Sequence, residues 1–244
     1  MNETIKLLHS RRSVRIFEDK PVPQELKQQL FEAAFAAPTA GNQQLYTIID
    51  VTDESLKQKL SVSCDNQGFI AKAPVVLVFC ADCKKWYDMY LTADASPRAP
   101  GVGDFILAVD DALIAAQNLV TAAESLGLSS CYIGDIMENR ETQIELLGLP
   151  RFVFPAAMLI LGYPTAAQAE REKPKRADGK FVVHENSYRE LSAEELRSMM
   201  AGRCGDKGFD EWMRAFCSRK YNSEFSREMS RSVREWIEKD FSDK

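Results

Sequence analysis

The feature that most constrains the fold is a long apolar segment, residues 104–127, near the middle of the chain. Its apolar residues recur at helical spacing, and they cover most of the helix circumference rather than a single stripe. Asp104 is placed to cap the first turn, and Gly127 is placed to end the last one. A helix that is apolar on nearly every side must be buried. We therefore expect it to form the spine of a large core or part of a subunit interface.

Shorter segments on both sides of this helix predict a fold of the α+β class. Apolar runs and their alternation predict strands at 46–51, 73–81, 128–136 and 154–164. Helical periodicity and capping signals predict helices at 3–10, 24–37, 54–64, 139–147, 192–201, 208–217 and 222–241. The simplest organisation is a single domain, with a core over residues 1–190 and a helical C-terminal extension over residues 191–244.

Charge balance excludes some classes of partner. The 244 residues include 31 Lys and Arg against 36 Asp and Glu, for a formal net charge of −5. Nucleic-acid binding needs an excess of basic side chains on one face, so we expect neither nucleic acid nor an anionic membrane as a partner. No apolar run approaches the length of a signal peptide or a membrane-spanning helix, which predicts a cytoplasmic protein.

Cysteine and histidine usage argues against metal and hydrolytic chemistry. Cys80 and Cys83 form a CxxC pair without the second pair that a zinc site needs, so no metal site is expected. We interpret the six scattered cysteines as reduced thiols of a cytosolic protein. Histidine occurs only at His9 and His184, which disfavours hydrolases that use a histidine base.

Four short segments are richer in charged and polar loop residues than packing requires. Residues 11–15 and 173–176 supply guanidinium and ammonium groups of the kind that hold phosphate. Arg12 and Arg15 would share one face if their segment were helical. Residues 38–44 and 132–135 supply small and amide side chains, which let a flat ring approach the backbone. Each signal alone is weak, because a solvated charge run or a simple turn explains any one of them.

The order of these segments carries a more specific resemblance. RRSVR, APTAGNQQ, ESLGL, YIGD, LGLP, LGYP, KPK and VVHENSY follow one another along nearly the whole chain. In this order they resemble the FMN-dependent nitroreductase family, and within it the oxygen-insensitive nitroreductases and flavin reductase P enzymes. The resemblance implies a nitroreductase-like α+β fold with a central mixed or antiparallel sheet flanked by helices. It also implies a homodimer with FMN at two interface sites.

The resemblance assigns residues of this chain to the cofactor. In the family, one segment holds the phosphate, ribityl chain and ring edge of FMN. The residues of this chain that match it are Arg11, Arg12, Ser13 and Arg15. Those matching its Lys-Pro-Arg phosphate segment are Lys173 and Lys175, with Arg176 as a substitute or supplement. Those matching a loop donated by the partner subunit are Pro38, Thr39, Ala40 and Asn42. Those matching groups at the ring are Gln67, Tyr132, Ile133, Gly134 and Asp135. Asp135 stands where the subgroup has a second glycine, and its charge would tune the flavin potential.

The implied activity is that of an NAD(P)H-dependent FMN oxidoreductase, which reduces nitroaromatics, quinones or flavins by a ping-pong mechanism. No side-chain acid or base is required, so no catalytic residue is assigned. Arg203 matches an arginine that meets the 2′-phosphate of NADPH in the subgroup, and Lys207 stands near a missing second arginine. Asp206 and Asp210 would repel that phosphate, which predicts a weaker preference for NADPH over NADH. A flavin reductase that supplies free reduced flavin, and a flavin-binding protein with little turnover, remain alternatives.

Overall fold

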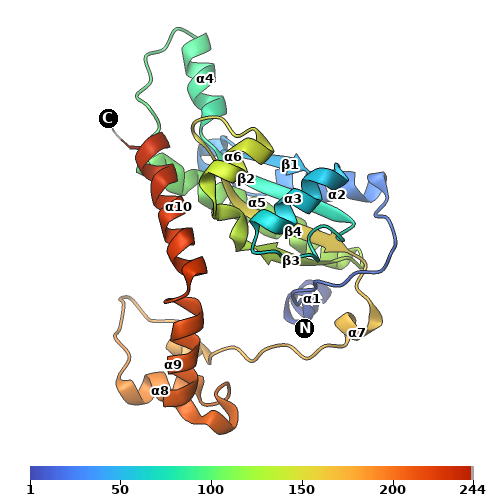
Figure 1. Cartoon of the computed structure of the whole chain (residues 1–244), viewed down its shortest axis with the longest axis vertical. Helices are drawn as coiled ribbons and strands as arrows, with labels where there is room; N and C mark the ends of the chain where they lie inside the picture. The colour runs from blue at the N-terminus through green and yellow to red at the C-terminus, as the bar shows by residue number, and fades with distance from the viewer. Residues whose placement is uncertain (243–244) are drawn as a thin grey trace. The chain divides into compact units, whose positions relative to one another are not determined.

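The computed structural model describes residues 1–242 (Figure 1). These residues form two compact units. The first comprises Met1–Glu170 together with the chain from Glu228 onward, and the second comprises Arg171–Arg227.

The first unit is built on a four-stranded sheet with the strand order β1-β2-β4-β3. Its strands are β1 (Tyr46–Asp50), β2 (Val75–Asp82), β3 (Ser129–Ile133) and β4 (Val153–Gly162). All neighbouring strands are antiparallel. The two central strands, β2 and β4, are buried along their whole lengths because they are apolar on both faces. The α+β class is thus confirmed, and the sheet is antiparallel rather than mixed over the described residues.

Helices flank this sheet in the first unit. They are α1 (Glu3–Ser10), α2 (Gln24–Phe35), α3 (Glu54–Ser63), α4 (Lys84–Thr92), α5 (Val102–Ser125), α6 (Arg140–Leu147) and α7 (Ala166–Ala169). The second unit contains α8 (Ala193–Met200) and α9 (Gly208–Lys220), and α10 (Glu224–Asp240) passes from it into the first unit. Short 3-10 turns are η1 (Ala40–Asn42), η2 (Gly134–Met137), η3 (Gly179–Phe181) and η4 (Gly205–Lys207). Each helix expected from the sequence is present, whereas α4 and the short α7 were not expected.

The long helix α5 is the core helix of the first unit. Small buried residues such as Ala108, Ala112 and Ala116 let it pack closely against β2 and β4. By length and composition alone, α5 is apolar enough to cross a membrane, although the sequence analysis expected no membrane-spanning helix. Because its alanine face packs against the sheet, we describe it as a core helix.

The start of α5 differs from the sequence prediction. The cap residue is Gly101, and Asp104 lies in the first turn, where its carboxylate accepts the Gly101 N–H at 2.8 Å. Asp104 also forms a two-pronged ion pair with Arg98. The negative charge therefore still lies at the helix N-terminus, where the macrodipole stabilises it, but at the third helical position and not at the cap.

The C-terminal half of α10 completes the core. Trp236 is fully buried, with its ring 5.6 Å from that of Phe154 in an edge-on arrangement. Arg140 of α6 pairs with Asp240 at 2.9 Å, and its guanidinium lies over the Trp236 ring. Phe225, Met229 and Val233, which share an apolar stripe of α10 with Trp236, are half-buried.

Candidate functional site

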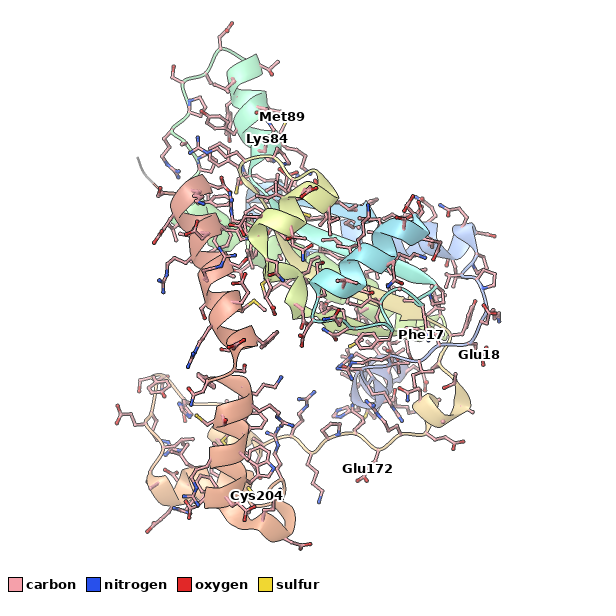
Figure 2. The ribbon with its side chains drawn as sticks, in the orientation of Figure 1. Phe17, Glu18, Lys84, Met89, Glu172 and Cys204 are labelled. Carbon is pink, nitrogen blue, oxygen red and sulfur yellow. The ribbon has the colours of Figure 1, made fainter. Side chains whose placement is uncertain are left out.

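The segment that follows α1 runs along the edge of the sheet. The helix ends at Ser10, and Val14 then donates its N–H to the carbonyl of Ser130 in β3 at 2.9 Å. Phe17 forms a bridge with Pro164 and lies beside the sheet (Figure 2). A side chain at Gly162 would come within 2.9 Å of Phe17, so this close approach requires glycine. The segment is extended and not helical, because the sheet edge takes over its hydrogen bonds, so Arg12 and Arg15 do not share a helical face.

The three arginines of this segment have different surroundings. Arg12 donates to the backbone carbonyl of Ala169, which ties its guanidinium to the end of α7. Arg11 and Arg15 form no ion pair or side-chain hydrogen bond within residues 1–242. Arg15 lies over the Phe69 ring, with 5.8 Å between its guanidinium carbon and the ring centroid. Arg11 and Arg15 therefore flank Ser13 as cations that an anionic group can use.

The residues expected at the flavin ring lie in the same unit. Tyr132 and Ile133 end β3, and Gly134 and Asp135 begin η2. Burial raises the pKa of Tyr132 to about 12, while the field of the Arg11 guanidinium acts in the opposite direction. Arg11 therefore lies close to the end of β3, beside the segment that would carry the ring.

Gln67 reaches this region from the loop after α3. Its amide donates to the carbonyl of Cys64 at 3.0 Å, and Cys64 in turn lies within the field of Asp135. Asp65 and Asn66, just before it, have φ angles of 59° and 54°, which are costly for residues other than glycine. This strained backbone places Gln67 near η2.

The loop of residues 38–44 depends on a residue that the sequence analysis did not single out. Asp111 is buried on α5, and its carboxylate accepts from the Thr39 hydroxyl, from the Ala40 N–H at 2.9 Å and from the Leu45 N–H at 3.0 Å. Asn42 and Gln44 have φ angles of 57° and 50°. A buried carboxylate with three donors is a strong anchor, and here it holds a strained loop in one conformation. The sequence signal that could have identified Asp111 is its position as an acidic residue on the buried face of an apolar helix.

Glu138 is a second buried acid that the sequence did not indicate. It follows η2, is 5% exposed, and its Oε1 has no hydrogen-bond partner within residues 1–242. Burial raises the pKa of its carboxyl to about 7, and the fields of Asp135, Asp65 and Glu228 add to the shift. The acid therefore holds a proton over much of the range in which an ordinary glutamate is ionised.

This shift predicts a pH-dependent stability. The folded protein keeps the proton on Glu138 up to about pH 7, whereas the unfolded chain releases it near the ordinary pKa of 4.5. The free energy of unfolding should fall as pH rises between these values, by about 3 kcal/mol in total. Glu138→Gln should remove this loss, and urea titrations at pH 5 and pH 8 measure it. The exposed Glu145→Gln is the control, and an equal gain at pH 8 in both variants would contradict the assignment.

The second unit contains a basic pocket of about 390 Å³. Its lining includes Lys173, Lys175, Arg203 and Trp212. One face of Trp212 stacks on Phe216, with ring centroids 4.7 Å apart and planes 12° apart. Arg176, also in this unit, is not among the residues that line the pocket.

The charges around this pocket differ from the sequence expectation. Arg197 holds Asp210 in a two-pronged ion pair, with the shorter contact at 2.8 Å, so Asp210 has a partner for its charge. Lys207 lies 4.0 Å from Glu211 and does not line the pocket. Arg203 therefore shares a pocket with Lys175 rather than with Lys207.

Five of the six cysteines are buried, and Cys217 is exposed. All six are free, and burial raises the pKa of Cys80 and of Cys83 to about 12. Within residues 1–242 no group of His, Cys, Asp and Glu side chains could hold a metal ion. Both thiols of the CxxC pair are therefore protonated and enclosed in the core.

Comparison with known proteins finds relatives along the whole chain. The model of the Nitroreductase family matches residues 8–163. A Bacillus subtilis protein named FMN reductase (NAD(P)H) is 34% identical over 98% of this chain and 92% of its own length. The oxygen-insensitive NADPH nitroreductase of Salmonella typhimurium is 37% identical over 80% of this chain and 79% of its own.

A solved structure extends the likeness to three dimensions. The NADPH:FMN oxidoreductase of Vibrio harveyi, determined in complex with NAD+, superposes with a TM-score of 0.81 at 28% sequence identity. The alignment covers 97% of this chain and 98% of that one. Both the core and the helical extension thus have counterparts in a known fold.

Proposed function

Since the chain belongs to the nitroreductase family, which its residues 8–163 match, we propose that it takes hydride from NAD(P)H and reduces small-molecule acceptors at a bound FMN. It is an oxidoreductase, as are relatives named FMN reductase and nitroreductase. When bound, FMN supplies the hydride and electron transfer, and the protein supplies position and electrostatics. The acceptors we propose are nitroaromatics, quinones and flavins.

The observation that carries the cofactor assignment is the pair of guanidinium groups beside Ser13. Arg11 and Arg15 make no ion pair within the described residues, although the chain has a net charge of −5. A phosphate dianion fits such a pair, and the end of β3 with η2 offers a flat backbone edge for a ring. We propose that Arg12 contributes through the backbone that it holds at the end of α7.

Replacing Arg15 tests this site. Arg15→Ala should raise the FMN dissociation constant about 10- to 150-fold, because a hydrogen bond to a charged group contributes roughly 1.5–3 kcal/mol. FMN titration monitored by flavin fluorescence measures the change. Arg151→Ala is the matched control, since Arg151 also lies over a phenylalanine ring, at 4.4 Å, but away from Ser13. Equal losses in both variants would exclude a phosphate contact by Arg15.

We propose that the basic pocket of the second unit holds the 2′-phosphate of NADPH. Arg203 and Lys175 line it, and neither forms an ion pair or side-chain hydrogen bond within residues 1–242. The preference for NADPH over NADH then rests on a guanidinium fork and one ammonium group. Lys207 contributes less, because Glu211 lies beside it.

Kinetics with two donors tests the pocket. Arg203→Ala should raise the KM for NADPH about tenfold, or ~1.4 kcal/mol, and leave the KM for NADH nearly unchanged. Lys175→Ala should act in the same direction, and Lys207→Ala should change either KM little. If Lys175→Ala instead lowers the FMN content of the purified protein, Lys175 belongs to the flavin phosphate site. If both donors suffer equally in Arg203→Ala, the pocket does not read the 2′-phosphate.

We infer a homodimer from the outer face of α5. Ile106, Leu113 and Ile114 are 53%, 38% and 42% exposed, although they are large apolar side chains. Contiguous apolar surface of this kind marks an interaction site. A second copy would cover it and bring residues 38–42 to the partner's cofactor, as the family resemblance implies.

We propose a cytoplasmic location. Free cysteines, five of them buried, fit a reducing cytoplasmic compartment.

The purified protein itself tests the function. It should be yellow with bound FMN and should oxidise NADPH with nitrofurazone, menadione or FMN as acceptor, giving parallel lines in double-reciprocal plots. Turnover with FMN alone would identify a flavin reductase. A yellow protein that reduces none of the three would be a flavin-binding protein. A colourless protein that takes up no FMN would contradict the proposal.

A further inference from the structure

The backbone around Glu138 is fixed by helix α10. Glu138 follows η2, and its N–H donates to the carbonyl of Asp135 at 3.0 Å. The Ser232 hydroxyl of α10 donates to the carbonyl of Met137 at 2.7 Å and accepts the N–H of Arg140 at 3.0 Å. Ser232 is fully buried, so this double contact ties down the chain on both sides of Glu138. The carboxyl group is therefore kept inside the protein and away from solvent.

The charges that face the Glu138 carboxyl group from the surrounding elements are negative. Asp135 faces it from η2, Asp65 from the loop after α3, and Glu228 from α10. Cys64, at the end of α3, lies in the field of Glu138, and its thiol is neutral because burial raises its pKa to about 12. Each of these neighbours disfavours a further negative charge or leaves it unbalanced.

The cations close to Glu138 in the chain and on α10 are already paired. Arg140 pairs with Asp240 at 2.9 Å. Arg231 pairs with Glu228 at 2.8 Å, which also balances part of the charge of that acid. Burial and the neighbouring acids raise the pKa of Glu138, and its Oε1 has no hydrogen-bond partner among the described residues. An ionised Glu138 would therefore be an unpaired buried charge, whereas the protonated form is neutral.

Glu138 lies next to the residues that the family resemblance assigns to the flavin ring. Asp135 is one of them, and it is hydrogen-bonded to Glu138 through the backbone. Gln67 is another, and its amide donates to the carbonyl of Cys64 at 3.0 Å. The Cys64 thiol lies in the fields of both Asp135 and Glu138. A change of charge at Glu138 therefore acts on the place where the ring would bind, without a contact between the two.

We propose that Glu138 is a positioning residue for the flavin reaction, which takes up one proton from solvent when the bound ring is reduced. The proposal rests on the FMN-dependent function proposed above. A hydride from NADPH brings one proton and two electrons, so the ring gains one negative charge and the nicotinamide becomes cationic. Where Glu138 is ionised, this new charge draws one proton from solvent onto the carboxylate, and the total charge around the ring is unchanged. Where Glu138 is already protonated, its proton stays in place.

The direction of the pH dependence follows from linkage between the proton and the flavin charge. Burial and the neighbouring acids raise the pKa of Glu138 to about 7, so it is mostly neutral at pH 6 and mostly ionised at pH 8.5. An ionised Glu138 opposes the charge that reduction adds, because like charges repel in a poorly solvated site. By reciprocity, a reduced ring raises the proton affinity of Glu138 by the same factor. We therefore expect reduction to become harder above about pH 7 in the parent protein, beyond the pH dependence of the flavin itself.

Glu138→Gln fixes the neutral form at every pH and tests the proposal. In redox titrations of the FMN-bound protein against a dye of known potential, the parent and Glu138→Gln should agree at pH 6. At pH 8.5 the equilibrium constant for reduction should be about tenfold lower in the parent, or about 30 mV for a two-electron couple. The exposed Glu145→Gln, on α6, is the matched control and should follow the parent at both pH values.

The outcomes separate this proposal from the proposed function. The titration uses no NADPH, so the expected divergence supports the role of Glu138 even if NADPH reduces neither protein, which would refute the donor alone. Equal potentials at pH 8.5 would overturn the proposal. So would an equal shift at both pH values, because a purely structural effect of the substitution does not depend on the proton. A protein that takes up no FMN would overturn this proposal together with the proposed function.

Discussion

Asp111→Ala should lower the free energy of unfolding by about 3–5 kcal/mol, because it leaves buried donors without an acceptor. Thr39, Ala40 and Leu45 all donate to this one carboxylate, and Asp111 is 3% exposed. Water cannot replace the lost oxygens without opening the contact between α5 and the loop. Urea denaturation of the apoprotein, followed by tryptophan fluorescence, measures the loss.

The neighbouring residue supplies a matched control. Asp110 lies next to Asp111 on α5 but is exposed, so Asp110→Ala should change stability by less than about 0.5 kcal/mol. Asp111→Asn keeps one acceptor oxygen and turns an amide N–H₂ toward donors, so its loss should fall between the two. If Asp110→Ala and Asp111→Ala are equally destabilised, the effect comes from helix charge and not from the loop anchor.

Asp111→Ala should also weaken the binding of FMN. Residues 38–42 adopt a backbone with positive φ at Gly41 and Asn42, which costs free energy that the Asp111 contacts offset. Without the anchor, the loop should relax and must be reordered on binding. We expect a lower FMN affinity in every Asp111→Ala preparation that remains folded. An unchanged FMN dissociation constant would show that the loop does not contact the cofactor.

The hydrophobic periodicity of the sequence predicted those helices and strands well whose apolar pattern matches the way they pack in the core. β2 and β4 are continuous apolar runs, and α5 has both the period and the length of a core helix, so all three lie close to their predicted bounds. α4 was missed because its short sequence, KKWYDMYLT, mixes charged and aromatic residues and shows no single apolar stripe. The sequence left the backbone of Arg12 and Arg15 open, because a long-range bond from Val14 to Ser130 decides it.

The candidate site was less accessible to sequence reasoning than the fold. The resemblance pointed to loops such as 38–44, but it could not indicate that a carboxylate on α5 holds that loop, since the two are about 70 positions apart. The sequence did not indicate Glu138 for the same reason, because its pKa depends on burial beside Asp135 and on Glu228 of α10. The position of Lys207 in the sequence also did not show that Glu211 lies beside it.

The second large effect is expected at the outer face of α5. Ile114→Asp should convert the protein to a 27.5 kDa monomer at micromolar concentration, because a twofold interface built on α5 would bury the new carboxylate next to its own copy. Val183→Asp, at a 76% exposed valine of the second unit, is the control and should leave the dimer intact. Sedimentation or light scattering measures the mass. FMN content should fall with the dimer if residues 38–42 serve the partner's site. A parent protein that is already monomeric would contradict the dimer, and a monomeric variant that keeps its FMN would show that each chain completes its own site.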